Sequence, residues 1–494
     1  MDMSLFPRGV PDRTHDASFP DAGWWSPEAL VQHERWKMRE GAIFVGQTRD
    51  AMLGVCDDRH IMTIAGSRAG KGRSVIIPNM CLYPGSVVVI DPKGDLATVT
   101  AARRGKGSDT SEGMGQAVYV LDPFMAARGN AEQYRAAFNP IDAIDPDGED
   151  GRDDAALLAD ALIIPSHVEA HWTDAAKLWI TGLILHVASL EDENARTLLE
   201  VRARLTGNEE ALTRTLAEMS CSDRCGGAIA RAANTLIAMS DRERSSVLST
   251  AIVQTDFLDS PAMAKVLSHS DFTLADIKNT PCTIYLSLPA GRMGTHSRWL
   301  RLMIALTIEA MERNRARPEH PALIIMDEFH VLGPMSVIER AAGLIAGFGV
   351  RLWPVLQDLT QLKRDYPESW ETFLGNAGLT QWFGLNDLTT LEYLSKRLGQ
   401  TTLESVSQGE ISMAQAANGY SGKSTTRQVV DLMSAEEIGR YFSRQSGRQL
   451  VLWPGTDPIA LSRTDYDRDA HFMGKFDPDP AYEQPAPERQ EAAA

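Results

Sequence analysis

The stretch that decides the fold is Ile61-Met-Thr-Ile-Ala-Gly-Ser-Arg-Ala-Gly-Lys-Gly-Arg-Ser-Val-Ile-Ile77. It opens with an apolar, β-branched run that is typical of a buried parallel strand. A loop of small residues, Ala65 to Gly70, follows, and Lys71 then leads into a segment of helical character. These are the parts of a phosphate-binding loop, in which backbone N–H groups and the positive end of a helix converge on an anion.

The loop departs from the usual pattern, G-x-x-x-x-G-K-[ST], at two positions. Ala65 stands where the first Gly is expected, and Gly72 stands where a Mg²⁺-binding hydroxyl is expected. Alanine would be tolerated if its φ is negative. Water or Ser74 would have to take the place of the missing hydroxyl. Taken alone, the stretch is equally compatible with a glycine-rich turn, so the interpretation needs a partner elsewhere in the chain.

Residues 322–328 supply that partner, because an apolar strand here runs into Asp327-Glu328. Asp327 would hold Mg²⁺, directly or through water. Glu328 would polarise the attacking water. Two exposed acids after a core strand are the alternative interpretation of this stretch alone. Together with the phosphate loop, in a chain that alternates strands and helices, the pair favours an ATPase.

Two further contributions to the site are expected. Gln357 ends the strand after the Asp-Glu strand and would contact the γ-phosphate. Phosphoryl transfer also benefits from an arginine that reaches into the site. If a neighbouring subunit supplies it, the active form is a ring. Arg340, Arg351 and Arg397 are possible donors, and the sequence does not choose among them.

The sequence therefore predicts ATP and Mg²⁺ as ligands of one site. The predicted catalytic residues are Lys71, Glu328 and Gln357, and the predicted metal ligand is Asp327. The predicted ATP-binding residues are Gly66, Ser67, Arg68, Ala69, Gly70, Lys71, Gly72 and Arg73.

Composition limits the other functional classes. The net charge of −17 argues against a protein coated by nucleic acid over its outer surface, but it does not exclude a locally basic channel. Five cysteines are few and odd in number, which fits a reducing cytosol. No apolar run approaches the roughly 18–20 residues that span a bilayer, so the chain as given is expected to be soluble.

Several local features allow more than one interpretation. Asp91 and Asp122 both end apolar runs and precede proline. Turn chemistry is the preferred interpretation for Asp122, whereas Asp91 and Lys93 stay open between a turn and a functional role. Pro78 should kink or stop the helix that follows the phosphate loop. Residues 400–430, rich in Gly, Ser, Thr and Gln, are expected to form a mobile loop.

The predicted fold class is α/β, with an all-α domain inserted between two halves of a sheet domain. The expected divisions are an N-terminal extension (1–40), the first part of the nucleotide-binding domain (41–190), the helical insertion (191–272), the second part of the nucleotide-binding domain (273–465) and a flexible acidic tail (466–494). Within the extension, Ser26 should cap a helix that packs on the main domain or on a partner.

The chain resembles the type IV secretion coupling proteins, the conjugative DNA-transfer ATPases of the TraG family. The resemblance runs from about residue 40 to residue 478. Its marks are Ala65 to Gly72 with Val75-Ile-Ile-Pro-Asn79, Asp91-Pro-Lys-Gly-Asp95, Phe138-Asn-Pro140, Thr283-Ile-Tyr285 with Leu288-Pro289, Ser297-Arg-Trp-Leu-Arg-Leu302, Met326-Asp-Glu-Phe329 with Leu332-Gly333, Gln357-Asp358 with Gln361-Leu362, and Phe383-Gly-Leu-Asn-Asp387. The family also tolerates Ala and Gly at the two unusual loop positions.

The resemblance implies a RecA-like P-loop NTPase domain with an inserted all-α domain associated with substrate choice. It also implies a hexameric ring at the cytoplasmic face of the inner membrane, with a relaxase–DNA complex or secreted proteins and the inner-membrane components of a type IV secretion system as partners. Most members begin with two transmembrane helices, which this sequence lacks, so we expect a cytoplasmic protein that reaches the membrane through partners.

Three functions fit these expectations. The first is an ATP-driven DNA translocase of conjugation, and the second is a receptor for secreted proteins that uses the same motor. The third is a nucleotide-dependent, effector-recruiting adaptor with little turnover of its own. Glu328 argues against the third, because a pure binding module needs no carboxylate that activates water.

Overall fold

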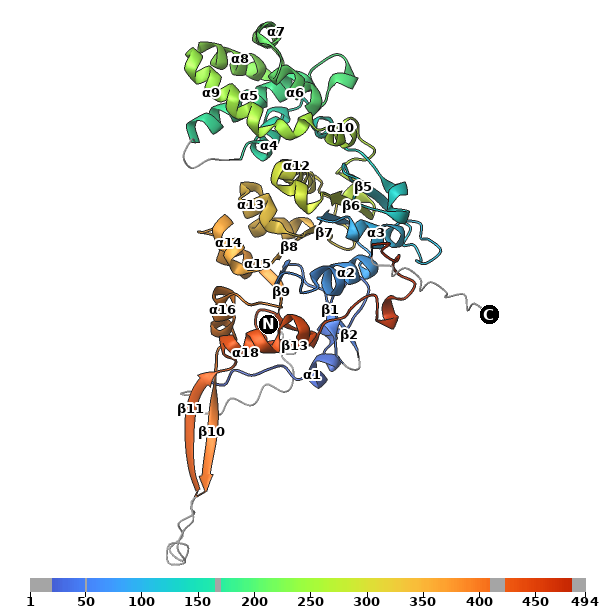
Figure 1. Ribbon diagram of the computed structural model, residues 1–494, viewed down its shortest axis with the longest axis vertical. Coiled ribbons are helices and arrows are strands. Elements are labelled where there is room, and N and C mark those ends of the chain that lie inside the picture. The colour runs from blue at the N-terminus through green and yellow to red at the C-terminus, as the bar shows by residue number, and fades with distance from the viewer. Residues whose placement is uncertain (1–19, 49–50, 165–169, 409–422, 482–494) are drawn as a thin grey trace, which may run out of the picture.

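The computed structural model describes residues 20–48, 51–164, 170–408 and 423–481. The molecule is elongated, with a sheet in the middle, a group of helices at one end and a two-stranded ribbon at the other (Figure 1). Within the described residues, no helix is long and apolar enough to cross a membrane.

A sheet of eleven strands, counted over the described residues, has the order β2-β1-β13-β12-β9-β3-β8-β7-β4-β6-β5. The strands from β9 to β5 run parallel, whereas β12, β13, β1 and β2 add on in antiparallel pairs. The parallel strands are β3 (His60–Ala65), β4 (Val87–Asp91), β5 (Ala117–Leu121), β6 (Cys282–Ser287), β7 (Ala322–Met326), β8 (Val350–Leu356) and β9 (Ala377–Phe383). The antiparallel strands are β1 (Ile43–Gln47), β2 (Met52–Val55), β12 (Arg448–Leu452) and β13 (Ile459–Ser462).

The parallel strands are apolar on both faces because both faces are covered. Successive residues of a strand point to opposite faces. In β7, Ile324 and Met326 therefore join the core that packs under the helical domain, whereas Leu323 and Ile325 join the core under α2 and α3. All of these side chains are buried, as expected for a parallel sheet between two layers. The predicted α/β fold with a parallel sheet is confirmed.

Helices cover both faces of the sheet. Those nearest the parallel strands are α2 (Ile77–Leu82), α3 (Asp95–Arg104), α11 (Asp276–Asn279), α12 (Ala290–Arg313), α13 (Ser336–Leu344), α14 (Leu359–Asp365), α15 (Trp370–Asn376), α16 (Leu388–Leu398) and α18 (Ala435–Tyr441). In the N-terminal segment, α1 (Pro27–Gln32) is capped by Ser26 as predicted. Leu30 and Trp36 are buried in the core under α2, so this segment packs on the main domain.

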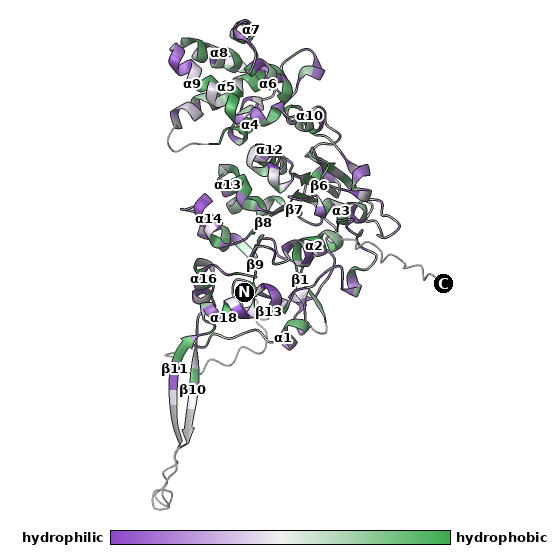
Figure 2. Cartoon of the chain, viewed as in Figure 1, coloured by the Kyte–Doolittle hydropathy of each residue, from purple (hydrophilic) through white to green (hydrophobic). Residues whose placement is uncertain are grey.

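The helical domain consists of α4 (Gly151–Leu162), α5 (Ala170–Ala188), α6 (Leu198–Leu205), α7 (Glu209–Ser220), α8 (Ala228–Ala238), α9 (Asp241–Gln254) and α10 (Pro261–Leu267). Hydrophobic residues lie along α5 and α6 in the middle of this group (Figure 2). Helix α5 packs against α4, α8 and α9. We therefore propose that the inserted domain begins near residue 150, and not at residue 191 as expected from the sequence.

Two local predictions need correction. Pro78 does not stop its helix, because it lies in the first turn of α2, and α2 continues to Leu82. A π-helical turn over Gly72–Ile76 directly precedes α2. Such turns are a common cause of a bend in a helix. Residues 400–430 are not simply a loop, because β10 (Gln400–Gln408) and β11 (Lys423–Asp431) pair as an antiparallel ribbon. Residues 409–422 between them lie outside the described residues.

Residues 466–481 pack against the sheet domain, in contrast to the predicted flexible tail. The Phe472 side chain is fully buried, and its ring lies edge-on to that of Phe44 at a centroid distance of 5.7 Å. The Asp477 carboxylate accepts hydrogen bonds from the Thr110 hydroxyl and the Asn130 amide. The segment thus completes the core under α2, and the remainder of the predicted tail, residues 482–494, lies outside the described residues.

This packing predicts that truncating two neighbouring side chains has different effects on the free energy of unfolding. Phe472→Ala should lower the free energy of unfolding by about 3–5 kcal/mol, the usual cost of deleting a buried phenyl ring. Met473→Ala should change it by no more than about 0.5 kcal/mol, because the Met473 side chain is 51% exposed. Urea denaturation of both variants measures this, and equal effects would show that the segment is not part of the core.

Candidate functional site

The glycine-bearing loop joins the carboxyl end of β3 to a helix that begins at Lys71. Ala65 is the last residue of β3 and is not among the residues with positive φ, which removes the first objection to the sequence pattern. The loop bends through Arg68 (φ 54°) and Gly70 (φ 94°). A positive φ is costly for arginine, so the surrounding structure must impose it.

The strand β9 holds the base of the loop. The Gly66 N–H donates to the Phe383 carbonyl at 3.2 Å. A Cβ added at Gly66 would lie 1.9 Å from the Gly384 carbonyl oxygen, so only glycine fits at this position. Gly72 is different, because a Cβ added there would meet no atom within 4 Å. The loop therefore depends on Gly66 for its shape, whereas Gly72 is an open position.

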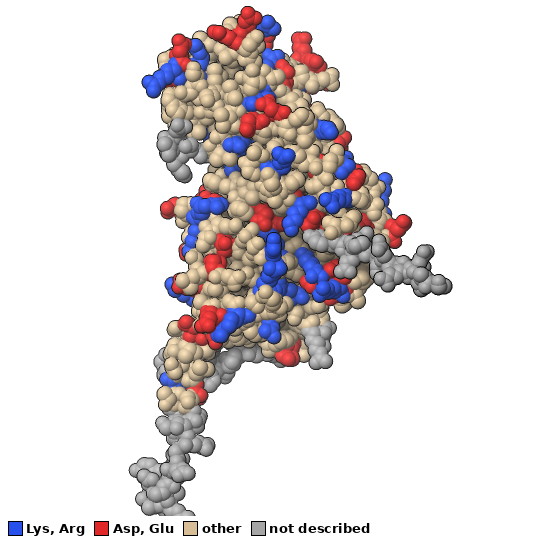
Figure 3. All heavy atoms as spheres, viewed as in Figure 1, with Lys and Arg blue, Asp and Glu red and all other residues tan. Residues whose placement is uncertain are grey.

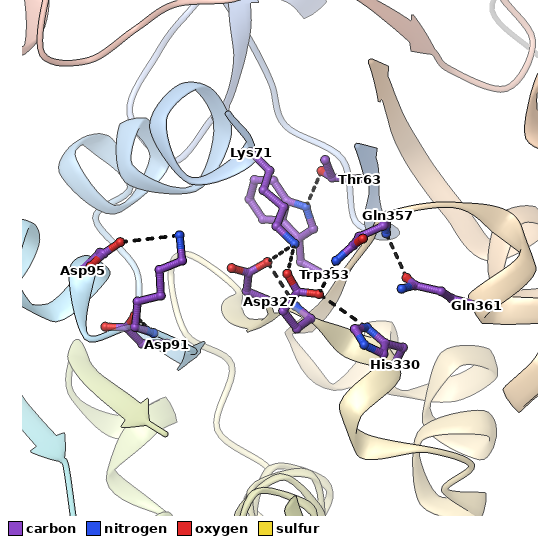
Figure 4. A network of polar contacts seen from close by, with 11 residues as sticks. Thr63, Lys71, Asp91, Asp95, Asp327, His330, Trp353, Gln357 and Gln361 are labelled. Carbon is purple, nitrogen blue, oxygen red and sulfur yellow. Dashed lines mark hydrogen bonds and ion pairs between the residues drawn. The ribbon is translucent and has the colours of Figure 1, made fainter. Parts of the chain in front are cut away.

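The Lys71 ammonium lies between two carboxylates from β7 (Figure 4). Its Nζ is 3.0 Å from Asp327 Oδ1 and 2.6 Å from Glu328 Oε1. All three side chains are at least three-quarters buried, with exposed fractions of 14%, 13% and 21%. The structure therefore brings together the loop lysine and the acid pair, which lie some 250 residues apart in sequence.

These contacts set the charges of the three groups. Burial acts to lower the pKa of Lys71, but Asp327 and Glu328 outweigh it and raise that pKa. Burial raises the pKa of Asp327, against the opposing effect of Lys71. Burial also acts to raise the pKa of Glu328, but the charge and hydrogen bond of Lys71, with the hydrogen bond of Gln357, lower it. Glu328 is consequently held as a carboxylate.

Glu328 is fixed by its backbone and by its neighbours. It adopts a left-handed conformation (φ 54°, ψ 46°), which is uncommon for glutamate and is found preferentially at functional sites. The Gln357 amide donates to Glu328 Oε2 at 3.0 Å, and His330 Nδ1 lies 3.4 Å from the same oxygen. Gln357 is itself oriented, since its backbone N–H donates to Gln361 Oε1 at 2.9 Å.

The order of the strands explains why these residues meet. In the sheet, β8 lies between β3 and β7, and all three are parallel. Their carboxyl ends therefore share one edge, where ligands of open α/β sheets bind. Lys71 follows β3, Gln357 follows β8 and Asp327 follows β7.

Three other residues singled out in the sequence, Asp91, Lys93 and Asp122, lie outside the group around Lys71. Asp122 accepts hydrogen bonds from the N–H groups of Ala126 and Ala127, which is the predicted turn chemistry. Asp91 is buried and accepts from the Ala97 N–H at 2.9 Å in the first turn of α3. Burial raises the pKa of Asp91 to about 7. Lys93 is exposed, 4.0 Å from Asp95.

Ser74 and Arg73 were expected to take part in ligand binding at the loop, but their side chains make other contacts. The Ser74 hydroxyl donates back to the Gly70 carbonyl at 2.9 Å and is buried, so it does not replace the hydroxyl missing at Gly72. The Arg73 guanidinium makes two hydrogen bonds of 2.6 Å to Asp467. Arg73 therefore ties the helix to the C-terminal segment, and its side chain does not enter the loop.

Sequence reasoning missed three contributors to the site. His330 lies beside Glu328, Gly384 packs on the base of the loop, and Arg463 donates a hydrogen bond to the Ala69 carbonyl. The Arg463 guanidinium also lies over the Phe383 ring, 4.9 Å from its centroid. Arg463 and Gly384 come from segments far from the loop in sequence. No local pattern marks such residues as neighbours.

The three arginines named as possible donors in trans occupy different places. Arg340 on α13 and Arg397 on α16 are exposed. Arg351 is buried at the start of β8. It is six residues before Gln357, which is roughly 20 Å along a strand at about 3.3 Å per residue. None of the three belongs to the group formed by Lys71 and the acid pair.

Comparisons with known proteins agree with this architecture. The family profile described as "Type IV secretory system Conjugative DNA transfer" matches residues 12–488. A conjugal transfer protein TraG from Escherichia coli is 27% identical over 389 residues, which cover 74% of this chain and 58% of that protein. The type IV secretion system-coupling protein VirD4 from Bartonella quintana is 26% identical over 428 residues, covering 83% of this chain and 63% of that protein. The chain thus spans about three-fifths of the length of these curated relatives.

Solved structures show the same fold. The bacterial conjugative coupling protein TrwBdeltaN70 superposes with a TM-score of 0.66 at 15% identity, covering 94% of this chain and 97% of that one. TrwB in complex with ADP and Mg²⁺ gives a TM-score of 0.63 at 14% identity, covering 93% and 98%. On the strength of the family match over nearly all of its length, the chain belongs to the type IV secretory system conjugative DNA transfer family.

Proposed function

We propose that this chain is the ATP-hydrolysing motor of a coupling protein, which recruits a relaxase–DNA complex or secreted proteins to a type IV secretion channel and drives their transfer. The observation that carries the proposal is the contact of Lys71 with Asp327 and Glu328, because it joins a phosphate loop to an acid pair at one edge of a parallel sheet. Lys and Arg side chains gather around α2 and α3 in the middle of one face, despite the net charge of −17 (Figure 3).

The residues present fit a nucleotide with Mg²⁺. Gly66 and Gly70 shape a loop whose backbone can approach phosphate oxygens, and Lys71 supplies a full positive charge beside it. Asp327 provides a hard carboxylate ligand for Mg²⁺, and with no hydroxyl at position 72 the remaining ligands would be water and phosphate oxygens. Mg²⁺, when bound, neutralises the charge that develops on the phosphates.

Entry of the phosphates requires Lys71 to exchange its carboxylate partners for phosphate oxygens. Asp327 is then free to bind the metal, and Glu328 is free to accept a proton from water. The Gln357 amide holds Glu328 Oε2, so it orients the base and senses whether Lys71 has moved. We propose Lys71, Glu328 and Gln357 as the catalytic residues and Asp327 as the metal ligand.

The family relationship also bears on how the chain assembles and where it works. The names of the relatives TraG and VirD4 refer to conjugal transfer and to a type IV secretion system. We propose that this chain likewise works beside inner-membrane components of such a system, as a ring of identical subunits. An arginine from the neighbouring subunit would complete each site.

Two substitutions separate binding from turnover. Lys71→Ala should abolish ATP binding, because the phosphates lose their cation. Glu328→Gln should keep binding within about threefold and lower the turnover rate by about 10²–10⁴, the range for loss of a general base. The controls are Glu371→Gln, an exposed glutamate on α15, and the wild type, both with and without single-stranded DNA. Normal hydrolysis by Glu328→Gln would refute its role, and nucleotide binding without any turnover by the wild type would favour the adaptor.

A pair of glycine variants tests the shape of the loop. Gly66→Ala should weaken nucleotide binding by about tenfold or more, which is about 1.4 kcal/mol, because its Cβ must displace the Gly384 carbonyl. Gly72→Ala introduces no such contact and should leave binding within about threefold. Calorimetric titration with ADP and Mg²⁺ compares the two. Equal losses would mean that the loop does not pack on β9 as described.

The open space at Gly72 leads to a gain-of-function variant. Gly72→Ser restores the hydroxyl of the usual pattern and meets no atom within 4 Å at its Cβ. The Mg²⁺ concentration that gives half-maximal ATPase activity should therefore fall. A titration with Mg²⁺ at fixed ATP measures this, and an unchanged midpoint would show that position 72 does not face the metal.

A further inference from the structure

A pocket lies at the edge of the sheet opposite to the edge that carries Lys71. It has a volume of about 550 Å³ and is lined by Arg35, Cys56, Asp57, Asp58, Arg59, Arg351 and Trp453. Arg59 directly precedes β3, and Arg351 is the second residue of β8, so the pocket sits where these parallel strands begin. We call it the arginine pocket. It shares no residue with the site at the carboxyl ends of the strands.

Arg351 is the unusual member of this pocket. Its side chain emerges on the same face of β8 as Trp353 and Val355, which belong to an apolar core. Only 6% of the residue is exposed. Its Nε is buried and has no hydrogen-bond partner within the described part of the chain. A buried N–H group without an acceptor is costly, and such a group needs a specific explanation.

Asp57, which lines the same pocket, does not satisfy Arg351. Both oxygens of Asp57 are bound by Arg59, with distances of 2.9 Å from Nε and 2.7 Å from Nη2. Burial acts to raise the pKa of Asp57, but the hydrogen bonds of Arg59 and the charges of Arg59 and Arg351 lower it. Arg351 thus acts on Asp57 through its charge, while the hydrogen bonds of Asp57 are used by another residue.

Arg35 and Arg59 are held at the rim by one aromatic ring. Their guanidinium carbons lie 5.0 Å and 6.0 Å from the centroid of the Trp453 ring. Such cation–π contacts fix the direction of a guanidinium, and they leave the N–H groups of Arg35 available for a ligand, whereas Arg59 already donates from Nε and Nη2 to Asp57. With Asp57 engaged by Arg59, Asp58 is the remaining acid of the lining, and it is exposed. The interior of the pocket therefore carries excess positive charge.

We propose that the arginine pocket binds a phosphate group, with Arg351 as its deepest ligand and with Arg35 and Arg59 at the rim. Planar guanidinium groups match phosphate oxygens with paired hydrogen bonds, and a group with several acceptors supplies what Arg351 lacks. The phosphate is either free in solution or part of a nucleic-acid strand. This inference does not rest on ATP hydrolysis.

The test uses the full chain with Lys71→Ala, so that the phosphate loop does not contribute. Inorganic phosphate is titrated into this variant by calorimetry, with chloride at matched ionic strength as the reference. We expect saturable binding of one phosphate per chain. Adding Arg351→Met should weaken it by about tenfold or more, and Arg35→Ala should weaken it less. Arg397→Ala removes an exposed arginine on α16 and should have no effect.

A single-stranded oligothymidine titrated into the same variants distinguishes free phosphate from the phosphates of a nucleic-acid strand as the ligand. Binding of phosphate without Arg351-dependent binding of the oligonucleotide identifies a free phosphate, and Arg351-dependent binding of the oligonucleotide identifies a strand. Absence of saturable binding of both probes, or binding that Arg351→Met leaves within threefold, would overturn the proposal.

Thermal unfolding in phosphate-free buffer supplies an independent check. Arg351→Met removes a buried N–H donor that has no acceptor, so it should not lower the melting temperature. A marked decrease would show that Arg351 is satisfied within the chain, and it would overturn the proposal as well.

Discussion

The ion pairs of the Lys71 ammonium with Asp327 and Glu328 are the interaction on which the rest of the site depends. Two buried carboxylates at adjacent positions repel each other, and a buried ammonium alone would favour its neutral form. The Lys71 ammonium keeps its charge because of the two carboxylates, and it in turn favours the ionised form of each acid. The same argument explains why the arrangement is suited to phosphate, since an entering phosphate offers Lys71 equivalent partners and releases both acids.

The sheet places these groups with little help from the loops. Because β8 lies between β3 and β7, the residues that follow these three strands meet at one edge. The neighbouring β9 supports the phosphate loop through Gly384, and the C-terminal segment holds the following helix through Asp467. Two segments from the C-terminal part of the chain therefore hold one short loop and the helix that follows it.

The sequence predicted the parallel strands and the meeting of Lys71, Asp327, Glu328 and Gln357, because these rest on continuous apolar runs that end in charged residues. It did not predict β1, β2 and β13, three antiparallel strands of four or five residues. The ribbon of β10 and β11 was taken for a loop because most residues of its two strands are polar. Gly384 and Arg463 were missed because contacts between distant segments leave no local pattern, whereas His330 lies only two residues after Glu328.

The central claim is that Lys71 exchanges its carboxylate partners for phosphate, and a crystal structure with a non-hydrolysable ATP analogue and Mg²⁺ tests it most directly. We predict that Lys71 Nζ moves from Asp327 and Glu328 to the β- and γ-phosphate oxygens, with Glu328 still held by Gln357. A structure with the nucleotide bound and the ion pairs of Lys71 intact, or with the nucleotide bound elsewhere, would contradict this account.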